Sequence, residues 1–235
     1  MKSKNVQSHY NNDVLERAGS AYEFDRWHKD AISKAGYWMT RKGLLKVLKK
    51  VNAKECFELG PGAGTWTKLL CERFPNVHIN AFDISSHMLE MAAENVKDCD
   101  IDFIEGDFDA YDGKEEWCDL FFSSRVFEYL PDQQKAVDTI EKILTPGGQG
   151  VISTKYPRGA APSDLHEGRV HPNAFRTLLK NAGLEVVSIS PLTLTVPFFK
   201  SATLNRVAYV FLGWMPLSII HALFCESYVV HFKKS

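Results

Sequence analysis

The sequence has no excess of charge of either sign, and this limits the partners that it can attract. Its 28 lysines and arginines are balanced by 29 aspartates and glutamates, which gives a formal net charge of −1. Proteins that bind nucleic acids through the phosphate backbone usually carry a surplus of basic residues. We therefore expect no nucleic-acid partner.

Cysteine is scarce, and the five cysteines are scattered along the sequence. None belongs to a Cys-x-x-Cys pair, and neither the cysteines nor the histidines have the spacing of a zinc site, so we expect no metal. Cys56, Cys71 and Cys118 lie in apolar segments, where an unpaired cysteine usually serves as a small core residue. Free thiols, and an N-terminus without the apolar stretch of a secretory signal, favour a cytoplasmic location.

What the sequence does contain is a regular alternation of short apolar strands and amphipathic helices. After a polar lead over 1–20, expected to be mobile, and a helical stretch over 22–50, strands are expected at 54–59, 77–82, 101–105, 118–123, 150–155, 184–189 and 227–232. Strands that alternate with helices form right-handed βαβ units around a largely parallel sheet. The sequence therefore predicts an α/β fold with a doubly wound sheet.

The strongest local motif is a glycine turn between the first strand and the helix that follows it. Gly60, Gly62 and Gly64 alternate with other residues there, and Glu58 lies just before them. Glycines let the backbone turn tightly and let a ligand touch the main chain, while the helix N-terminus contributes a positive end. A dinucleotide site would need glycine at Thr65, and Glu58 would be an unfavourable neighbour for its pyrophosphate. A ligand with a cationic amino group fits this motif better.

Two further acidic residues follow the next two strands. Asp83 ends the second strand, where doubly wound folds place a carboxylate that accepts hydrogen bonds from ribose hydroxyls. Asp107 follows the third strand and is placed to accept a hydrogen bond from an adenine amino group. Ile84 and Phe108, each beside one of these acids, are expected to pack on the adenine ring. Acids at successive strand ends thus predict a nucleoside-containing ligand.

Five segments that carry these features resemble the class I S-adenosylmethionine-dependent methyltransferases, of the broad group that acts on small molecules, lipids and sugars. The segments are Glu58–Thr65, Ala81–Leu89, Glu105–Phe108, Cys118–Asp132 and Leu144–Gly150. The resemblance covers roughly residues 20–190 and the last strand. It implies S-adenosylmethionine as the cofactor and a seven-stranded sheet that is parallel except for a final antiparallel strand.

The resemblance also implies roles for individual residues. The glycine loop and Glu58 would hold the methionine end of the cofactor, Asp83 its ribose and Asp107 its adenine. Main-chain groups of Ser123 and Ser124 would face the reactive methyl group. We therefore expect the cofactor to lie along the carboxyl edge of the first four strands.

Residues at the sides of this edge are candidates for covering the cofactor and orienting the acceptor. Tyr22 and Arg26 match family positions that close over the methionine moiety and its carboxylate. The family often has a histidine after the fourth strand, where this chain has Tyr129 following Glu128. The loop that ends at His171 follows the fifth strand, on the side expected for the acceptor. Glu128, Tyr129 and His171 are therefore the candidates for orienting the acceptor.

An apolar run near the C-terminus distinguishes the chain from a plain methyltransferase fold. We divide the chain into an N-terminal lead with cap helices (1–50), a cofactor-binding core (51–191), a helical cap insertion (192–226) and a final strand (227–235). Within the insertion, residues 207–225 carry no formal charge. A single membrane span there would separate two strands that must pair in one sheet, so we expect a broken helical cap and no transmembrane span. Its apolar face could shield a lipid-like acceptor, bury against a second subunit in a homodimer, touch a membrane peripherally or complete the core.

The sequence therefore predicts an S-adenosylmethionine-dependent methyltransferase that acts on a small-molecule or lipid-like acceptor. Two alternatives stay open. One is a catalytically silent module that binds S-adenosylmethionine, and the other is a nicotinamide-dependent oxidoreductase. The acceptor itself is not encoded in any of these motifs.

Overall fold

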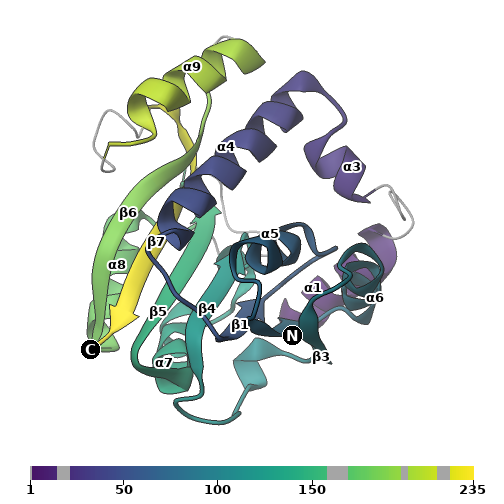
Figure 1. Ribbon diagram of the computed structural model, residues 1–235, viewed down its shortest axis with the longest axis vertical. Coiled ribbons are helices and arrows are strands. Elements are labelled where there is room, and N and C mark those ends of the chain that lie inside the picture. Colours follow the sequence, from purple (N-terminus) through teal and green to yellow (C-terminus); the bar gives the residue numbers. More distant parts are fainter. Residues whose placement is uncertain (1, 15–21, 158–168, 197–200, 216–222) are drawn as a thin grey trace.

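The computed structural model describes residues 2–14, 22–157, 169–196, 201–215 and 223–235. In these ranges the chain forms one seven-stranded sheet with the order β3-β2-β1-β4-β5-β7-β6 and with helices on both faces (Figure 1). The strands are β1 Glu55–Leu59, β2 His78–Asp83, β3 Asp100–Glu105, β4 Cys118–Ser124, β5 Leu144–Lys155, β6 Leu184–Leu194 and β7 Cys225–Lys234. Within this sheet β7 runs antiparallel to both β5 and β6, and the other pairs are parallel. The predicted doubly wound α/β fold is confirmed.

The helices connect and cover the strands. They are α1 Lys2–Ser8, α3 Tyr22–Trp27, α4 Ala31–Leu48, α5 Thr65–Arg73, α6 Ser86–Asn95, α7 Gln133–Ile143, α8 Pro172–Asn181 and α9 Ala202–Leu212, with short helical turns η1 His9–Asp13, η3 Phe108–Ala110 and η4 Phe127–Tyr129. α4 and α5 contribute to one apolar core, and α7 and α8 contribute to another. The two cores lie on opposite faces of the sheet.

Alternation along the strands decides which face each side chain joins. On β1, Phe57 packs in the core of α7 and α8, whereas Cys56 packs in the core of α4 and α5. Successive side chains of a strand point to opposite faces, so Glu58 lies on the same face as Cys56. Asp83 shares that face because it alternates with Ala81 on β2. Two acidic side chains from neighbouring strands therefore lie on the α5 side of the sheet.

The N-terminal lead differs from the prediction of a mobile segment. Residues 2–14 form α1 and η1, and Val6 and Val14 are buried. The hydroxyl of Ser85, at the N-terminus of α6, hydrogen-bonds the side chain of Asn11. The lead has only two apolar anchors among polar residues, so its sequence resembles a solvated tail although the segment packs on α6. Residues 15–20 of the predicted lead lie outside the described residues.

The predicted helical stretch over 22–50 is divided into α3 and α4. The chain leaves the helical conformation before Asp30, whose side chain accepts a hydrogen bond from the Ser33 N–H at 2.7 Å and so caps α4. An aspartate at this position satisfies an N–H that the helix itself leaves unpaired. The break lets α3 turn toward the carboxyl edge of the sheet while α4 packs on its face (Figure 1).

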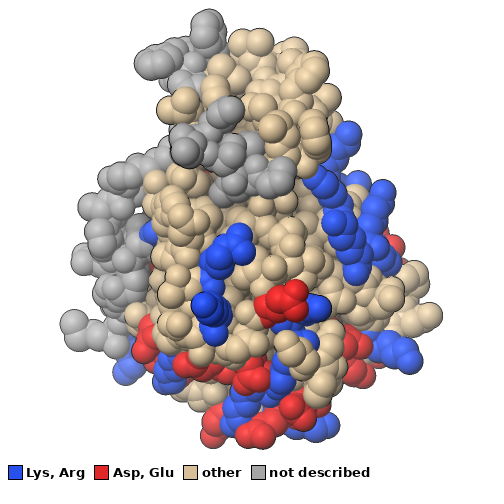
Figure 2. All heavy atoms as spheres, turned by 90° about the vertical axis from the view of Figure 1, so that its left-hand side faces the viewer, with Lys and Arg blue, Asp and Glu red and all other residues tan. Residues whose placement is uncertain are grey.

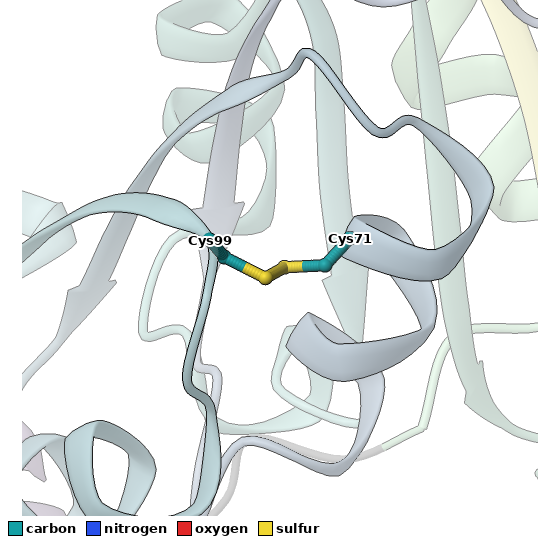
Figure 3. Close-up of a disulfide and its surroundings, with 2 residues drawn as sticks. All are labelled: Cys71 and Cys99. Carbon is teal, nitrogen blue, oxygen red and sulfur yellow. A yellow bond between two sulfur atoms is a disulfide. The ribbon is translucent and has the colours of Figure 1, made fainter.

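The cysteines also differ from the prediction, because they are not all free. Cys71 on α5 and Cys99, which immediately precedes β3, form a disulfide with a Cα–Cα distance of 6.1 Å (Figure 3). Cys56, Cys118 and Cys225 are free and buried. The two paired residues are separated by 28 positions and carry no spacing signature. Their pairing follows from the way α5 packs beside the start of β3, which no local pattern reveals.

The C-terminal insertion is shorter than predicted, because the strands on both sides of it are longer. β6 continues to Leu194, and β7 begins at Cys225. Between them α9 packs against α4 and β6, and residues 216–222 of the apolar run lie outside the described residues. Within the described ranges, no helix combines the length and the apolar character that a bilayer-spanning segment needs.

Candidate active site

A cavity opens at the carboxyl ends of β1, β2 and β4, where parallel α/β sheets usually bind their ligands. Its lining includes many of the residues that the sequence singles out: Tyr22, Arg26, Gly60, Gly62, Asp83, Ile84, Asp107, Phe108, Ser124 and Tyr129. Strands far apart in the sequence bring these residues together. Glu58, Gly64, Ser123, Glu128 and His171 do not line this cavity, and their places are described below.

The glycine loop adopts a backbone that other residues rarely tolerate. Gly60, Gly62 and Gly64 have φ angles of +71°, +56° and +87°. A Cβ on Gly60 would collide with the side chain of Val126, and one on Gly64 would collide with Val96 at the end of α6 and press on Ala92. A Cβ on Gly62 would instead point into open space. The loop therefore presents bare main chain to the cavity at Gly62 and packs closely on its other side.

Glu58 lies directly beneath this loop and is 1% exposed. Its Oε2 atom has no hydrogen bond of good geometry within the protein, although the Thr67 hydroxyl lies close enough to interact with the carboxyl group. Burial raises the pKa of Glu58 to about 8 against this opposing interaction with Thr67, and the charge of Asp83 adds a smaller rise. An orphaned carboxyl oxygen at this depth is costly unless a donor reaches it. The position is therefore ready to receive a hydrogen-bond donor, and a cationic donor would favour the ionised carboxylate.

Asp83 connects the end of β2 to the glycine loop. Its Oδ1 accepts a hydrogen bond from the Ser85 N–H at 3.0 Å, and its Oδ2 accepts one from the Gly62 N–H at 3.4 Å. Burial raises the pKa of Asp83 to about 6 even though these hydrogen bonds favour its ionised form. A carboxylate oxygen can accept more than one hydrogen bond. Asp83 can thus hold the loop and accept from a ligand hydroxyl at once.

Asp107 and Phe108 line the cavity where β3 ends. The carboxylate of Asp107 accepts a hydrogen bond from the Asp109 N–H at 3.0 Å and caps η3. Phe108 is largely buried and stacks on Tyr111 with ring centroids 5.9 Å apart. Only part of its ring therefore faces the cavity, and Ile84 adds a second apolar surface there.

Tyr10, Tyr22 and Arg26 from the N-terminal segment also line the cavity. Arg26 donates from Nη1 to the hydroxyl of Tyr22 at 2.7 Å. The ring of Tyr10 packs edge-on against Tyr129, with centroids 6.2 Å apart. Tyr10 is missing from the sequence-predicted site, as are Val6, Met88 and other lining residues. The lead carries no motif that would have revealed Tyr10, since its position depends on contacts with α6.

The two serines at the end of β4 occupy different environments. The hydroxyl of Ser123 donates to the carbonyl of Leu59 at 3.0 Å, which ties β4 to β1 below the cavity. Ser124 lines the cavity, and its hydroxyl hydrogen-bonds that of Ser153 at 2.9 Å. Arg125, which follows, also lines the cavity and has a positive φ of 68°. A non-glycine residue in this conformation is strained, and such residues cluster at functional sites. Sequence reasoning missed Arg125.

Glu128 and His171 are held by the protein itself. Glu128 is 3% exposed, and its carboxylate accepts hydrogen bonds from Arg125 Nε at 3.3 Å and from the Thr154 hydroxyl at 2.7 Å. His171 caps α8, because its Nδ1 accepts a hydrogen bond from the Asn173 N–H, while its Nε2 lies 3.3 Å from the Tyr156 hydroxyl. The neighbouring residues 166–168 of the predicted loop lie outside the described residues.

The comparisons with known proteins agree with this geometry. Residues 57–148 match the family model for a methyltransferase domain. The chain is 34% identical over 98 residues to the malonyl-[acyl-carrier protein] O-methyltransferase 1 of Ilyobacter polytropus, covering 41% of this chain and 36% of that protein. It is 30% identical over 145 residues to the phosphoethanolamine N-methyltransferase 2 of Caenorhabditis elegans, and the match covers 58% of this chain and 32% of that protein. The chain thus spans about a third of the length of these two curated relatives.

Solved structures share the fold at lower identity. The [4+2]-cyclase SpnF superposes with a TM-score of 0.70 at 13% identity, covering 100% of this chain and 96% of that one. The Haemonchus contortus phosphoethanolamine N-methyltransferase 2 was solved in complex with S-adenosyl-L-methionine. It gives a TM-score of 0.63 at 18% identity, and the match covers 90% of this chain and 59% of that one. The matched domain contains the strands and loops that build the cavity. Residues 57–148 therefore carry a methyltransferase domain, and the chain as a whole has the α/β fold of solved methyltransferases.

Proposed function

We propose that the chain transfers a methyl group from S-adenosylmethionine to a small-molecule, lipid or sugar-type acceptor by in-line displacement. One observation carries this proposal: Gly60, Gly62 and Asp83 line one cavity on the carboxyl edge of the sheet, and the buried Glu58 lies beneath the same loop. These are the groups that a ligand with an amino group and a ribose would engage.

The residues present fit this cofactor. The Oε2 atom of Glu58 can accept a further hydrogen bond, which an ammonium group supplies and a pyrophosphate does not. The bare main chain at Gly62 lets a ligand approach closely. Asp83 and Asp107 would accept hydrogen bonds from the ribose and from the adenine amino group, with Ile84 and Phe108 beside the ring. The same features count against a nicotinamide dinucleotide.

When bound, S-adenosylmethionine supplies a methyl group on a sulfonium centre, which is already an activated donor. The protein then has to align the acceptor with that methyl group and exclude water. Tyr22 and Arg26 would cover the methionine end, and Tyr10 and Tyr129 would close the cavity above it. A general base is needed only for an acceptor that is a poor nucleophile at neutral pH, such as a hydroxyl.

The relatives do not indicate whether this chain methylates an oxygen or a nitrogen atom of its acceptor. One is named as an O-methyltransferase and the other as an N-methyltransferase, at similar identity to this chain. Glu128, Tyr129 and His171 remain candidates for orienting the acceptor. Of these, Tyr129 lines the cavity, and Glu128 would act by holding Arg125.

A catalytically silent binding module is the alternative of a different class. SpnF has this fold and is named as a cyclase, so the fold alone does not establish methyl transfer. Incubation with S-adenosylmethionine labelled on the methyl group and with fractionated metabolite and lipid extracts separates the two functions. A methyltransferase yields a labelled product and S-adenosylhomocysteine in equal amounts. Tight binding without any product across the fractions would support the silent module instead.

We further propose that α9 gives the protein a peripheral contact with an anionic membrane surface. Val210, Phe211 and Trp214 are 58%, 67% and 67% exposed. In the described part of the face shown in Figure 2, charged residues gather lower down and along one edge, and the upper part is nearly free of charge. Apolar side chains flanked by basic ones are typical of helices that lie in the membrane interface.

Cations lie at the seam between α4 and α9. Lys46 Nζ donates to the Trp214 carbonyl at 3.2 Å, and the charged groups of Lys42 and Arg206 lie 4.6 and 5.7 Å from the Trp38 ring centroid. Such cations attract anionic lipids. Sedimentation with vesicles that contain phosphatidylserine should pellet the protein, whereas phosphatidylcholine vesicles should not.

The double variant Phe211→Ser/Trp214→Ser should lose this binding, and Val187→Ser, which removes an exposed apolar residue from β6, should keep it. Equal sedimentation with both vesicle types, or with neither, would contradict the proposal. If the wild type is a dimer and the double variant is a monomer, the surface binds a second subunit instead.

The cytoplasmic location stays a prediction, and the Cys71–Cys99 disulfide counts against it, since such bonds are rare in that compartment.

A further inference from the structure

Cationic side chains gather where β4 and β5 end, next to the proposed methyl-transfer site. Arg125 follows β4 and lines the cavity, and Lys155 is the last residue of β5, the strand that pairs with β4. Burial, and then the positive charges of Arg125, Arg169 and Arg26, lower the pKa of Lys155. These groups are therefore close enough to repel one another, so the protein alone does not explain why they are together.

The carboxylate of Glu128 lies among these cations and offsets part of their charge, since it pairs with Arg125 and raises the pKa of Lys155. Both oxygens of Glu128 are engaged, by Arg125 Nε at 3.3 Å and by the Thr154 hydroxyl at 2.7 Å. Although burial opposes ionisation, the charge of Arg125 and these hydrogen bonds hold the pKa of Glu128 below its usual range. Glu128 is thus a charged partner for Arg125. Within the described residues, Lys155 and Arg169 have no carboxylate at salt-bridge distance.

The backbone holds these cations in place. Arg125 has a left-handed backbone, and its N–H donates to the Ser153 carbonyl at 2.8 Å. The carbonyl of Val170, next to Arg169, accepts a hydrogen bond from the Tyr228 hydroxyl at 2.6 Å. A half-buried cation without a partner is unfavourable, and so is a non-glycine residue at positive φ. When an unpartnered cation and a strained backbone occur at one place, their free-energy cost indicates a ligand site, and the positive charge indicates an anion.

The cofactor supplies one carboxylate, and Arg26 beside Tyr22 is placed for it. The remaining cations are left for another ligand. We infer that the methyl acceptor carries a carboxylate or phosphate group, which binds between Arg125, Lys155 and Arg169. This inference rests on the proposed function, since it identifies the bound anion with the acceptor. Arg and Lys both bind such groups through charge-assisted hydrogen bonds.

Calorimetry with inorganic phosphate and with succinate as probes, at constant ionic strength, tests the anion site without turnover. The wild-type protein should bind at least one probe, and Lys155→Met and Arg169→Met should each weaken that binding about tenfold, the usual effect of losing one charge-assisted hydrogen bond. Arg176→Met, on the exposed side of α8, is the matched control and should bind as the wild type does. The preferred probe distinguishes a phosphate site from a carboxylate site.

Two outcomes would overturn the inference. One is probe binding that is equal in the wild type, both variants and the control. The other is label from S-adenosylmethionine that enters only the fraction of an extract that an anion exchanger does not retain. Binding of S-adenosylmethionine, measured in the same samples, should be unchanged in Lys155→Met. If the wild type binds the probes but not S-adenosylmethionine, the proposed function fails, while the anion site stands.

Discussion

Asp83, which ends β2, lies close enough to the buried Glu58 of β1 for their charges to interact. Burial and then this charge raise the pKa of Glu58 to about 8, and burial raises that of Asp83 to about 6. The protein thus keeps two acids at the edge of the sheet in a costly environment. Both would gain from a ligand that brings an ammonium group and hydroxyl donors. Their titration therefore reports on the cofactor.

Cofactor binding should release a proton near neutral pH. Glu58 is protonated below pH about 8 in the free protein, and an ammonium group would favour its ionised form. Affinity should therefore rise with pH up to about 8 and level off above it. Calorimetric titration in buffers of different ionisation enthalpy measures the released protons. Glu58→Gln should bind more weakly and release fewer protons, and equal proton release by both proteins would contradict this role.

The same pKa shift predicts how the free protein responds to pH. An acid whose pKa is raised on folding binds more protons in the folded state, so stability falls as pH rises between the unfolded and folded pKa values. For Glu58 this window runs from about 4.5 to about 8. Glu58→Gln should remove this loss, so its urea midpoint should exceed that of the wild type at about pH 8.5. A wild-type midpoint that exceeds the variant's at that pH would argue against the raised pKa.

Asp83→Ala should weaken cofactor binding by about 1.5–3 kcal/mol, the cost of losing hydrogen bonds to a charged group. This corresponds to a roughly tenfold to hundredfold higher Kd. The matched control is Asp102→Ala on β3, an exposed acid that pairs with His78 away from the cavity. Unchanged affinity in a folded Asp83 variant would show that Asp83 does not bind the ribose.

Gly62 and Gly183 form a natural pair for testing the glycine loop. Both have positive φ angles, +56° and +78°, and a Cβ at either would meet open space. Valine at either position should therefore strain the backbone by a similar amount, about 1–2 kcal/mol. Gly62→Val should abolish cofactor binding because its side chain enters the cavity, and Gly183→Val, at the end of α8, should retain it. Loss in both variants would point to instability and not to the loop.

The parts of this site that sequence reasoning found are those with local signatures. Gly60, Gly62 and Gly64 need a conformation that few residues tolerate, and Asp83 and Asp107 follow strands with an apolar pattern. Such constraints act within a few residues and are therefore visible in the sequence. The sheet was predictable for the same reason, since buried parallel strands are nearly continuous apolar runs.

The parts that were missed depend on contacts between distant segments. Tyr10 reaches the cavity because Asn11 bonds Ser85 on α6, and the polar lead gives no hint of that contact. The Cys71–Cys99 pair likewise depends on how α5 meets β3. Arg125 looks like an ordinary loop residue until its backbone conformation is known. Propensity and spacing contain no information about such contacts.

Reduction of the Cys71–Cys99 bond should lower stability without affecting the cofactor. The bond closes a loop with a sequence separation of 28, for which loop-closure entropy gives about 3.6 kcal/mol. Urea unfolding with and without reductant measures this difference, and Cys71→Ser/Cys99→Ser should behave as the reduced protein does. Neither cysteine lines the cavity, so S-adenosylmethionine affinity should stay the same. Identical unfolding curves would show that the bond does not form in solution.

Equilibrium binding distinguishes a site for S-adenosylmethionine from a site for a dinucleotide. Calorimetric titration of the purified wild-type protein with S-adenosylmethionine, and separately with NAD, compares the two ligands on the same cavity. We expect saturable binding of S-adenosylmethionine at one site per chain, which Gly62→Val abolishes and Gly183→Val retains, and no binding of NAD. Binding of NAD in place of S-adenosylmethionine, or binding of S-adenosylmethionine that Gly62→Val leaves intact, would contradict this expectation.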